Sequence, residues 1–204
     1  MRRPFARRAS FLFSAVCASL LAGALVVPAI ADEVASDVVF VIGDYSRDEG
    51  GEWRLADSPI RGPFGIDFDR DDRLYLVELT SGRIHRVDGE DEPETGQLVT
   101  LSDAKPKGFA GDGGPLKDAL FNGPHNCVVA DGRALLVSDS WNHCVRSIDL
   151  DTLQVKTIAG TGEAGFSGDG GDAVNARFDY VMCIALDPAG RTIHIADLKN
   201  RRVR

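Results

Sequence analysis

Cysteine and histidine are scarce in this chain, and they lack the spacings in which they bind metals. The 204 residues include four cysteines and four histidines, and no C-x-x-C or Cys/His pair has the spacing of a zinc site. Cys17 lies in an apolar N-terminal run. The other three, Cys127, Cys144 and Cys183, cannot all pair in an oxidising compartment because their number is odd. We expect them to be small buried hydrophobic residues.

Recognisable catalytic motifs are also missing. No Ser/His/Asp set, pair of catalytic carboxylates or nucleophile motif occurs in the sequence. His143 belongs to a repeated turn, and His85 and His194 fall in different predicted strands. His125 is therefore the one histidine that we place at a candidate binding surface, and a single histidine does not make a metal site.

The sequence has one long hydrophobic run, and it lies at the N-terminus. Four arginines precede the apolar run 11–27, and Ala29-Ile30-Ala31 has the small-x-small pattern of a cleavage site. We interpret residues 1–31 as a secretory signal peptide. This predicts an exported protein, periplasmic or extracellular, with no stable membrane insertion after cleavage.

Basic residues are fewer than acidic residues in this chain. The chain has 23 basic and 31 acidic residues, a net charge of −8. Cleavage after residue 31 would remove four arginines and leave 19 basic residues, for a net charge of −12. Such a chain repels polyphosphates, so we expect no nucleic acid among its partners.

Glycine, in contrast, is abundant and marks an internal repeat. GFAGDGG at 108–114 returns as GFSGDGG at 165–171, with six identities in seven positions. We align Cys127 with Cys183, and the run from Asp139 to Arg146 with the run from Asp197 to Arg204. A more diverged copy begins at Gly62-Pro63. The chain thus contains three copies of one unit.

Each unit is predicted to consist of short antiparallel strands separated by turn residues such as Asp-Gly. The expected strands are 66–69, 74–79, 83–88 and 97–101 in the first copy, 127–130, 134–138, 144–150 and 153–159 in the middle copy, and 182–187 and 192–196 in the third, which ends inside its third strand. Four repeated antiparallel strands per unit are typical of β-propeller blades. We therefore predict an all-β fold.

The repeated core resembles a known family. DSWNHCVRSID from Asp139 and DLKNRRVR from Asp197 are similar to the NHL repeat, whose core is D-x-x-N-x-x-[VI]-R. The weaker ELTSGRIHRVD from Glu78 departs from it at Gly82, where Asn is expected, and Cys144 replaces a residue that is often basic. The resemblance covers about residues 63–204 and implies an NHL-type β-propeller, usually six-bladed.

About three blades are present, which is too few to close a propeller of four to eight blades. We interpret 62–107, 108–164 and 165–204 as blades, the last truncated, and the chain as the N-terminal portion of a longer protein. Residues 32–61 are interpreted as an N-terminal strand and linker. Its VVFVIG run from Val38 is expected to be the outer strand of another blade.

The glycine-rich loops allow two ligand hypotheses, and we reject both. Gly160, Gly162 and Gly165 fit the G-x-G-x-x-G pattern of a dinucleotide-binding turn, but further glycines follow in place of a helix, and the sister loop lacks the pattern. Each loop also offers two carboxylates to calcium, which takes six to eight oxygen ligands. We predict connectors between blades that need positive φ at several glycines.

These connectors place varied residues at the mouth of the central channel, where we expect a ligand to bind. The candidate binding residues are Asp112, His125, Asn126, Asp169 and Tyr180. We predict a non-catalytic module for a protein or glycan ligand, with no cofactor. The alternative is a metal-dependent lyase or hydrolase in the channel, to which His125 would contribute. Calcium or zinc is expected only under that alternative.

Overall fold

The computed structural model describes residues 53–54, 58–88 and 96–204. The predicted signal peptide and the strand expected from Val38 lie outside these residues. The described segments form strands and three single-turn 3-10 helices, so the prediction of an all-β fold is confirmed.

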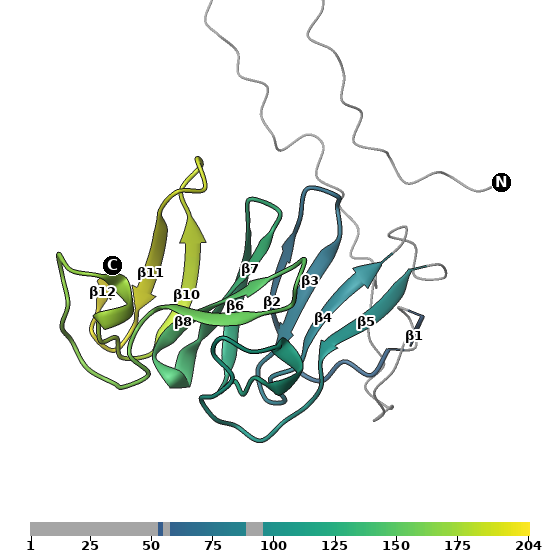
Figure 1. Cartoon of the computed structure of the whole chain (residues 1–204), viewed down its shortest axis with the longest axis horizontal. Helices are drawn as coiled ribbons and strands as arrows, with labels where there is room; N and C mark the ends of the chain where they lie inside the picture. Colours follow the sequence, from purple (N-terminus) through teal and green to yellow (C-terminus); the bar gives the residue numbers. More distant parts are fainter. Residues whose placement is uncertain (1–52, 55–57, 89–95) are drawn as a thin grey trace, which may run out of the picture. The chain divides into compact units, whose positions relative to one another are not determined.

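The strands form three antiparallel sheets (Figure 1). The first sheet has the order β1-β5-β4-β3-β2, with β1 Trp53–Arg54, β2 Pro63–Phe68, β3 Leu74–Glu78, β4 Ile84–Asp88 and β5 Gln97–Ser102. The middle sheet has the order β6-β7-β8-β9, with β6 Pro124–Ala130, β7 Ala134–Asp139, β8 Cys144–Asp149 and β9 Val155–Ala159. The third sheet contains β10 Val181–Leu186, β11 Ile193–Asp197 and β12 Arg202–Val203.

The first strands of the three units lie next to one another. Strand β6 contacts both β2 and β10, as expected for the inner strands of adjacent propeller blades. Long connectors lead from β5 to β6 and from β9 to β10, and each contains one 3-10 turn, η3 Leu116–Asp118 or η5 Ala173–Asn175. A third turn, η4 Ser140–Asn142, joins β7 to β8.

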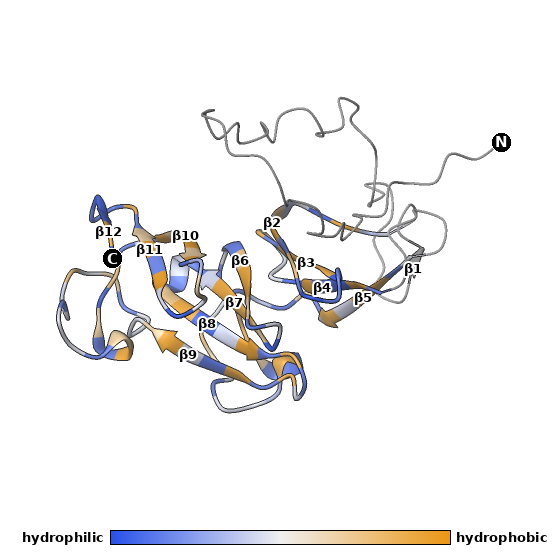
Figure 2. Cartoon of the chain, turned by 90° about the horizontal axis from the view of Figure 1, so that it is seen from above, coloured by the Kyte–Doolittle hydropathy of each residue, from blue (hydrophilic) through white to orange (hydrophobic). Residues whose placement is uncertain are grey.

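Hydrophobic residues are concentrated in the strands, while the hairpin tips are hydrophilic (Figure 2). One buried cluster joins Tyr75 and Val77 of β3 to Cys127 of β6, and Phe121 of the connector closes it. The middle sheet is therefore covered on one face by the first sheet. A second buried cluster covers its other face and consists of Leu136, Val145, Ala159, Ala176, Phe178, Val181, Ile184 and Ile195.

The strand register corrects the alignment of Cys127 with Cys183. Cys127 pairs with Val137, which lies two residues before Asp139. In the third sheet the residue two before Asp197 is Ile195, and it pairs with Ile184. Cys183 therefore corresponds to Asn126. It is exposed, while Cys127 and Cys144 are buried as predicted. The hydrophobic requirement at the Cys127 position is met by isoleucine in the third sheet.

The register also corrects the departure assigned to Gly82. Ile84 pairs with Val77 as Val145 pairs with Ser138, which places Ser81 at the asparagine position and Gly82 at the position of His143. Gly82 and His143 both have left-handed backbone, with φ of 69° and 55°. The glycine thus satisfies a conformational requirement of this turn.

No helix in the described ranges is long and apolar enough to span a membrane.

Candidate functional site

Two connectors and two turns meet at the N-terminal ends of β6 and β10. The backbone N–H of Trp141, in the β7–β8 turn, donates to the carbonyl of Asn122 in the first connector at 3.0 Å. In the third sheet the N–H of Lys199 donates in the same way to the carbonyl of Asp179 at 3.0 Å. We call this end of the sheets the connector face.

Three aromatic rings surround the ring of His125 on the connector face. The ring centroid of His125 lies 4.9 Å from that of Phe64, 5.8 Å from that of Trp141 and 5.2 Å from that of Tyr180, all in edge-to-face geometry. His125 is 6% exposed, whereas Phe64 is 50% exposed. We call these four residues the aromatic cluster. It combines side chains from the beginning of β2, the beginning of β6, the β7–β8 turn and the second connector.

The hydrogen bonds of His125 determine its tautomer. Its Nδ1 lies 2.7 Å from the carbonyl oxygen of Gly123, which can only accept, so Nδ1 carries the proton. Its Nε2 is then the acceptor for the Tyr180 hydroxyl at 2.8 Å. The phenol donates this hydrogen bond to the imidazole, and its oxygen lone pairs are left to accept hydrogen bonds from a ligand.

Tyr180 has left-handed backbone with a φ of +70°, which is uncommon for a residue with a bulky side chain. By strand register, its position is equivalent to that of Gly62 and Gly123 in the other two units, where φ is +67° and +65°. Tyrosine thus occupies a position at which the sister units have glycine. Backbone strain of this kind is concentrated at functional sites.

His143 supports the strained backbone at Tyr180. Its Nδ1 accepts the backbone N–H of Tyr180 at 3.0 Å. Burial lowers the pKa of His143, and the neighbouring Lys199 lowers it further, while Asp179 opposes both. The ring is therefore neutral at pH 7, as this hydrogen bond requires.

Two lysines lie over rings of the aromatic cluster. The Lys107 Nζ is 4.4 Å from the centroid of Trp141, and the Lys199 Nζ is 5.7 Å from that of Tyr180. Lys199 also forms an ion pair of 3.5 Å with Asp179. Within the described segments Lys107 has no carboxylate partner. Positive charge therefore adjoins the rings in a chain that is acidic overall.

Asp112 and Asp169 lie outside this cluster. Asp112 Oδ1 is 2.7 Å from Nη2 of the fully buried Arg146, and Asp169 Oδ1 is 2.5 Å from Nη2 of Arg204. Asp139 Oδ2 lies 3.5 Å from Nη1 of the same Arg146, in an ion pair that is fully buried. In both connectors the GDGG aspartate therefore fixes the loop to the arginine of its own sheet. No hydrogen bond or ion pair in the described residues joins Asp112 or Asp169 to the aromatic cluster.

Asn126 borders the cluster and joins two sheets. Its Oδ1 accepts the backbone N–H of Ile184 in β10 at 2.9 Å, and its own N–H donates to the Ser138 hydroxyl at 2.8 Å. Its side-chain oxygen therefore contributes to the contact between adjacent units. Of the five predicted binding residues, only His125 and Tyr180 contact each other through their side chains.

Sequence reasoning did not single out Trp141, Lys107 or Lys199. Trp141 and Lys199 occupy the same position of the D-x-x-N turn, where the first unit has Thr80. This variation within a repeated frame was a usable signal. Lys107 precedes Trp141 by 34 residues, and no repeated pattern links the two, so their proximity could not be predicted from the sequence.

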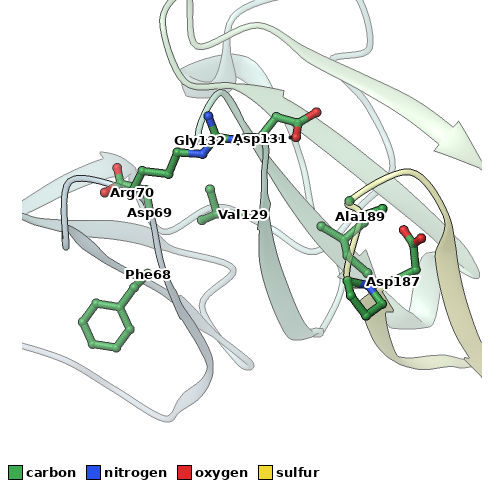
Figure 3. A pocket seen from close by; sticks show the side chains of 11 residues that line it. Phe68, Asp69, Arg70, Val129, Asp131, Gly132, Asp187 and Ala189 are labelled. Carbon is green, nitrogen blue, oxygen red and sulfur yellow. Dashed lines mark ion pairs between the residues drawn. The ribbon is translucent and has the colours of Figure 1, made fainter. Parts of the chain in front are cut away.

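A hollow lies at the C-terminal end of β6, away from the aromatic cluster (Figure 3). It has a volume of about 330 Å³ and is bordered by the hairpin turns after β2, β6 and β10, including Arg70, Asp131 and Asp187. The Asp187 Oδ1 accepts two backbone N–H groups of its own turn, from Arg191 at 2.6 Å and from Thr192 at 2.8 Å. Arg70 and Asp131 are solvent-exposed and 3.7 Å apart. These contacts are those of ordinary turns, so the aromatic cluster remains the better candidate site.

Comparisons with known proteins agree with the repeat. The chain is 29% identical over 150 residues to Protein SUPPRESSOR OF QUENCHING 1, chloroplastic, from Arabidopsis thaliana, a match that covers 70% of this chain and 13% of the plant protein. It is 26% identical over 133 residues to NHL repeat-containing protein 2 of Gallus gallus, and this match covers 64% of this chain and 17% of the Gallus gallus protein. The matches thus span less than a fifth of either relative. No protein-family model matches the chain.

Solved structures share the fold. An auxiliary nutrient binding protein from Bacteroides thetaiotaomicron matches with a TM-score of 0.58 and 24% identity, over 69% of this chain and 36% of that one. One from Bacteroides ovatus has a TM-score of 0.58 and 21% identity, over 73% and 38%. The successive antiparallel sheets, of five, four and three strands, give the chain the fold of a β-propeller protein. The repeated D-x-x-N-x-x-V-R core and the match to the Gallus gallus protein make it similar to NHL-repeat proteins.

Proposed function

We propose that this chain is a non-catalytic binding module of an exported NHL-repeat protein, and that it holds a protein or glycan ligand at the aromatic cluster. The observation that carries the proposal is Tyr180. It adopts left-handed backbone at a position where the other two units have glycine, and its side chain contacts His125 of the neighbouring unit. The half-exposed ring of Phe64 supplies apolar surface beside this pair.

Three further considerations support the proposal. Ligand sites combine apolar and aromatic surface with a few oriented polar groups, which is the composition of the aromatic cluster. The structurally similar Bacteroides proteins are described as nutrient binding proteins. The N-terminal run with its preceding arginines supports export.

The test separates binding from stability by replacing Tyr180 with glycine. Glycine fits the backbone, as Gly62 and Gly123 do, so Tyr180→Gly should leave the unfolding midpoint unchanged or slightly raised. Wild type and variant would be applied to an oligosaccharide array and a peptide array. We expect a probe that binds wild type and loses at least about tenfold in affinity with Tyr180→Gly, which is about 1.4 kcal/mol.

The matched control is Asp131→Gly, which also replaces a residue with positive φ, of 50°, but lies at the opposite end of β6. It should bind every probe as wild type does. If no probe binds wild type, or if binding does not depend on Tyr180, the proposed site is wrong.

A further inference from the structure

The charges and hydrogen-bonding groups around the aromatic cluster indicate what kind of ligand it accepts. We propose that the ligand is a sugar that carries a carboxylate, of the hexuronate type. This inference rests on the proposed function, because it names the ligand class of the same site.

The carboxylate would bind Lys107. Lys107 is exposed, its Nζ is held 4.4 Å from the Trp141 centroid, and within the described segments no carboxylate pairs with it. Lys199 is different because Asp179 lies 3.5 Å from its Nζ and offsets its charge. A ligand carboxylate at Lys107 would complete an ion pair directly above an aromatic face.

The sugar ring would contact the rings and the acceptor groups. Phe64 is 50% exposed while it packs edge-to-face with His125, so about half of its surface is available to the C–H surface of a pyranose. The Tyr180 hydroxyl uses its O–H to donate a hydrogen bond to His125, so its oxygen can accept one, and a hydroxyl of the sugar is a suitable donor. An apolar surface, an acceptor and a cation together match the three chemical features of a hexuronate.

The net charge disfavours the other acidic ligands. At −8 the chain repels partners with several closely spaced negative charges, such as an acidic peptide or a nucleic acid. A uronate residue carries a single carboxylate, and it adds hydroxyl donors that an acidic peptide side chain lacks. The acidic peptide is therefore an outcome of the test and not the proposal.

The experiment is a calorimetric titration of the full chain with trigalacturonate and with the neutral galactotriose of the same linkage. We expect trigalacturonate to bind at least tenfold more tightly. Lys107→Gln should reduce this ratio to below threefold without changing the affinity for galactotriose. Lys156→Gln, which removes an exposed lysine from the outer strand β9, should leave the ratio as in wild type.

Equal affinity for the two sugars, or no binding of either, would overturn the assignment of a sugar acid. Preferential binding of hexaglutamate over both sugars would overturn it in favour of an acidic peptide. In each case, the proposed binding site would still hold if another array probe binds and its binding depends on Tyr180. If no probe requires Tyr180, the proposed function fails together with the ligand assignment.

Discussion

At the scale of single residues, Arg146 explains why the repeated motifs recur together. Its guanidinium is fully buried and contacts Asp139 of its own sheet and Asp112 of the connector. The rings of Phe109 and Phe121 lie 5.2 and 5.1 Å from it. A buried charge is tolerated only when it is paired and hydrogen-bonded, so the arginine, the aspartates and the phenylalanines depend on one another.

Replacing Asp112 tests whether it stabilises the fold or binds the ligand. Asp112→Asn leaves Arg146 with one carboxylate fewer, and because Asp112 is 44% exposed we expect a cost of only about 1–2 kcal/mol. Urea unfolding measures this, with Asp118→Asn as the control. Asp118 forms an exposed pair with Lys117 and should cost less than about 0.5 kcal/mol. If the ligand affinity falls and the stability does not, the structural role is wrong.

Acidification should release the backbone at Tyr180. The pKa of His143 is lowered by burial from its ordinary value of 6.5, so in that range the folded state binds fewer protons than the unfolded chain. Its contribution to stability is present above pH 6.5 and is lost as the pH falls through the lowered value. The imidazolium cannot accept the Tyr180 N–H, so ligand affinity should fall at least about threefold between pH 7.5 and 5.

His143→Asn provides the comparison, because asparagine tolerates the left-handed backbone and does not titrate. Its ligand affinity should vary less with pH than that of wild type. An identical pH profile for the two proteins would assign the dependence to another group.

At the scale of the elements, the connectors fill the space between sheets as well as linking them. Phe178 and Ala176 of the second connector are buried in the cluster that joins the middle and third sheets. Phe121 and Ala119 occupy the same place between the first and middle sheets. This explains why these four residues recur with the glycine loops.

Truncating Phe178 should therefore weaken the contact between the middle and third sheets. A cost of about 3–5 kcal/mol is expected for Phe178→Ala, from lost apolar burial and the cavity that remains. Hydrogen exchange should localise the loss of protection to β10 and β11. Phe166→Ala is the control, because Phe166 is 46% exposed, and it should cost much less. A uniform loss of protection over all sheets would contradict this.

The first sheet uses different residues for the same purpose. Glu78 replaces the aspartate of the motif, and His85 stands at the position of Arg146. Glu78 Oε1 is 3.3 Å from the His85 Nε2 and accepts from Arg83 Nη2 at 2.9 Å. Burial raises the pKa of Glu78, but the hydrogen bonds from His85, Arg83 and Ser81 outweigh it and lower the pKa to about 2.

This sheet should therefore be sensitive to acid. Between pH 4.5 and 2 the unfolded chain protonates Glu78 while the folded state keeps it ionised, so stability rises with pH and is lost on acidification. The free energy of unfolding should fall by about 1–3 kcal/mol across this window. Glu78→Gln should be destabilised at pH 7 and should lack that part of the pH dependence; an unchanged slope would contradict the assignment.

At the scale of the whole molecule, charge determines which partners can approach. At a net charge of −8, a single-stranded RNA should bind more weakly than about 100 μM at 150 mM salt. Fluorescence anisotropy with a labelled 20-nucleotide RNA measures this. A salt-sensitive affinity in the micromolar range would show that a local basic surface overrides the net charge.

Much of the fold could be predicted because the same order of strands and turns occurs three times along the sequence. The strands β7, β8 and β11 were predicted to within about a residue at each end, since Asp-Gly turns and alternating hydrophobic residues bound them. Errors arose where one copy diverged. The pairing of Cys127 with Cys183 followed residue identity, whereas the backbone register follows the requirement for a buried side chain.

The site was predicted only in part. Variation among the units at the start of each inner strand pointed to His125 and Tyr180, and the structure joins them at 2.8 Å. The same reasoning proposed Asp112 and Asp169, whose carboxylates contact the buried arginines of the motif. Sequence position alone could not distinguish these cases, because a loop aspartate has the same signature whether it binds a ligand or fixes the loop.

The sequence by itself determined the all-β blades and the similarity to the NHL repeat, because periodicity and turn chemistry act between neighbouring residues and are repeated along the chain. Only the tertiary structure decided which residues form the aromatic cluster. Phe64, His125, Trp141 and Tyr180 come from three units, and their contacts depend on how adjacent sheets pack. The left-handed backbone of Tyr180 was likewise decided by its place in the connector, since tyrosine alone does not favour that conformation.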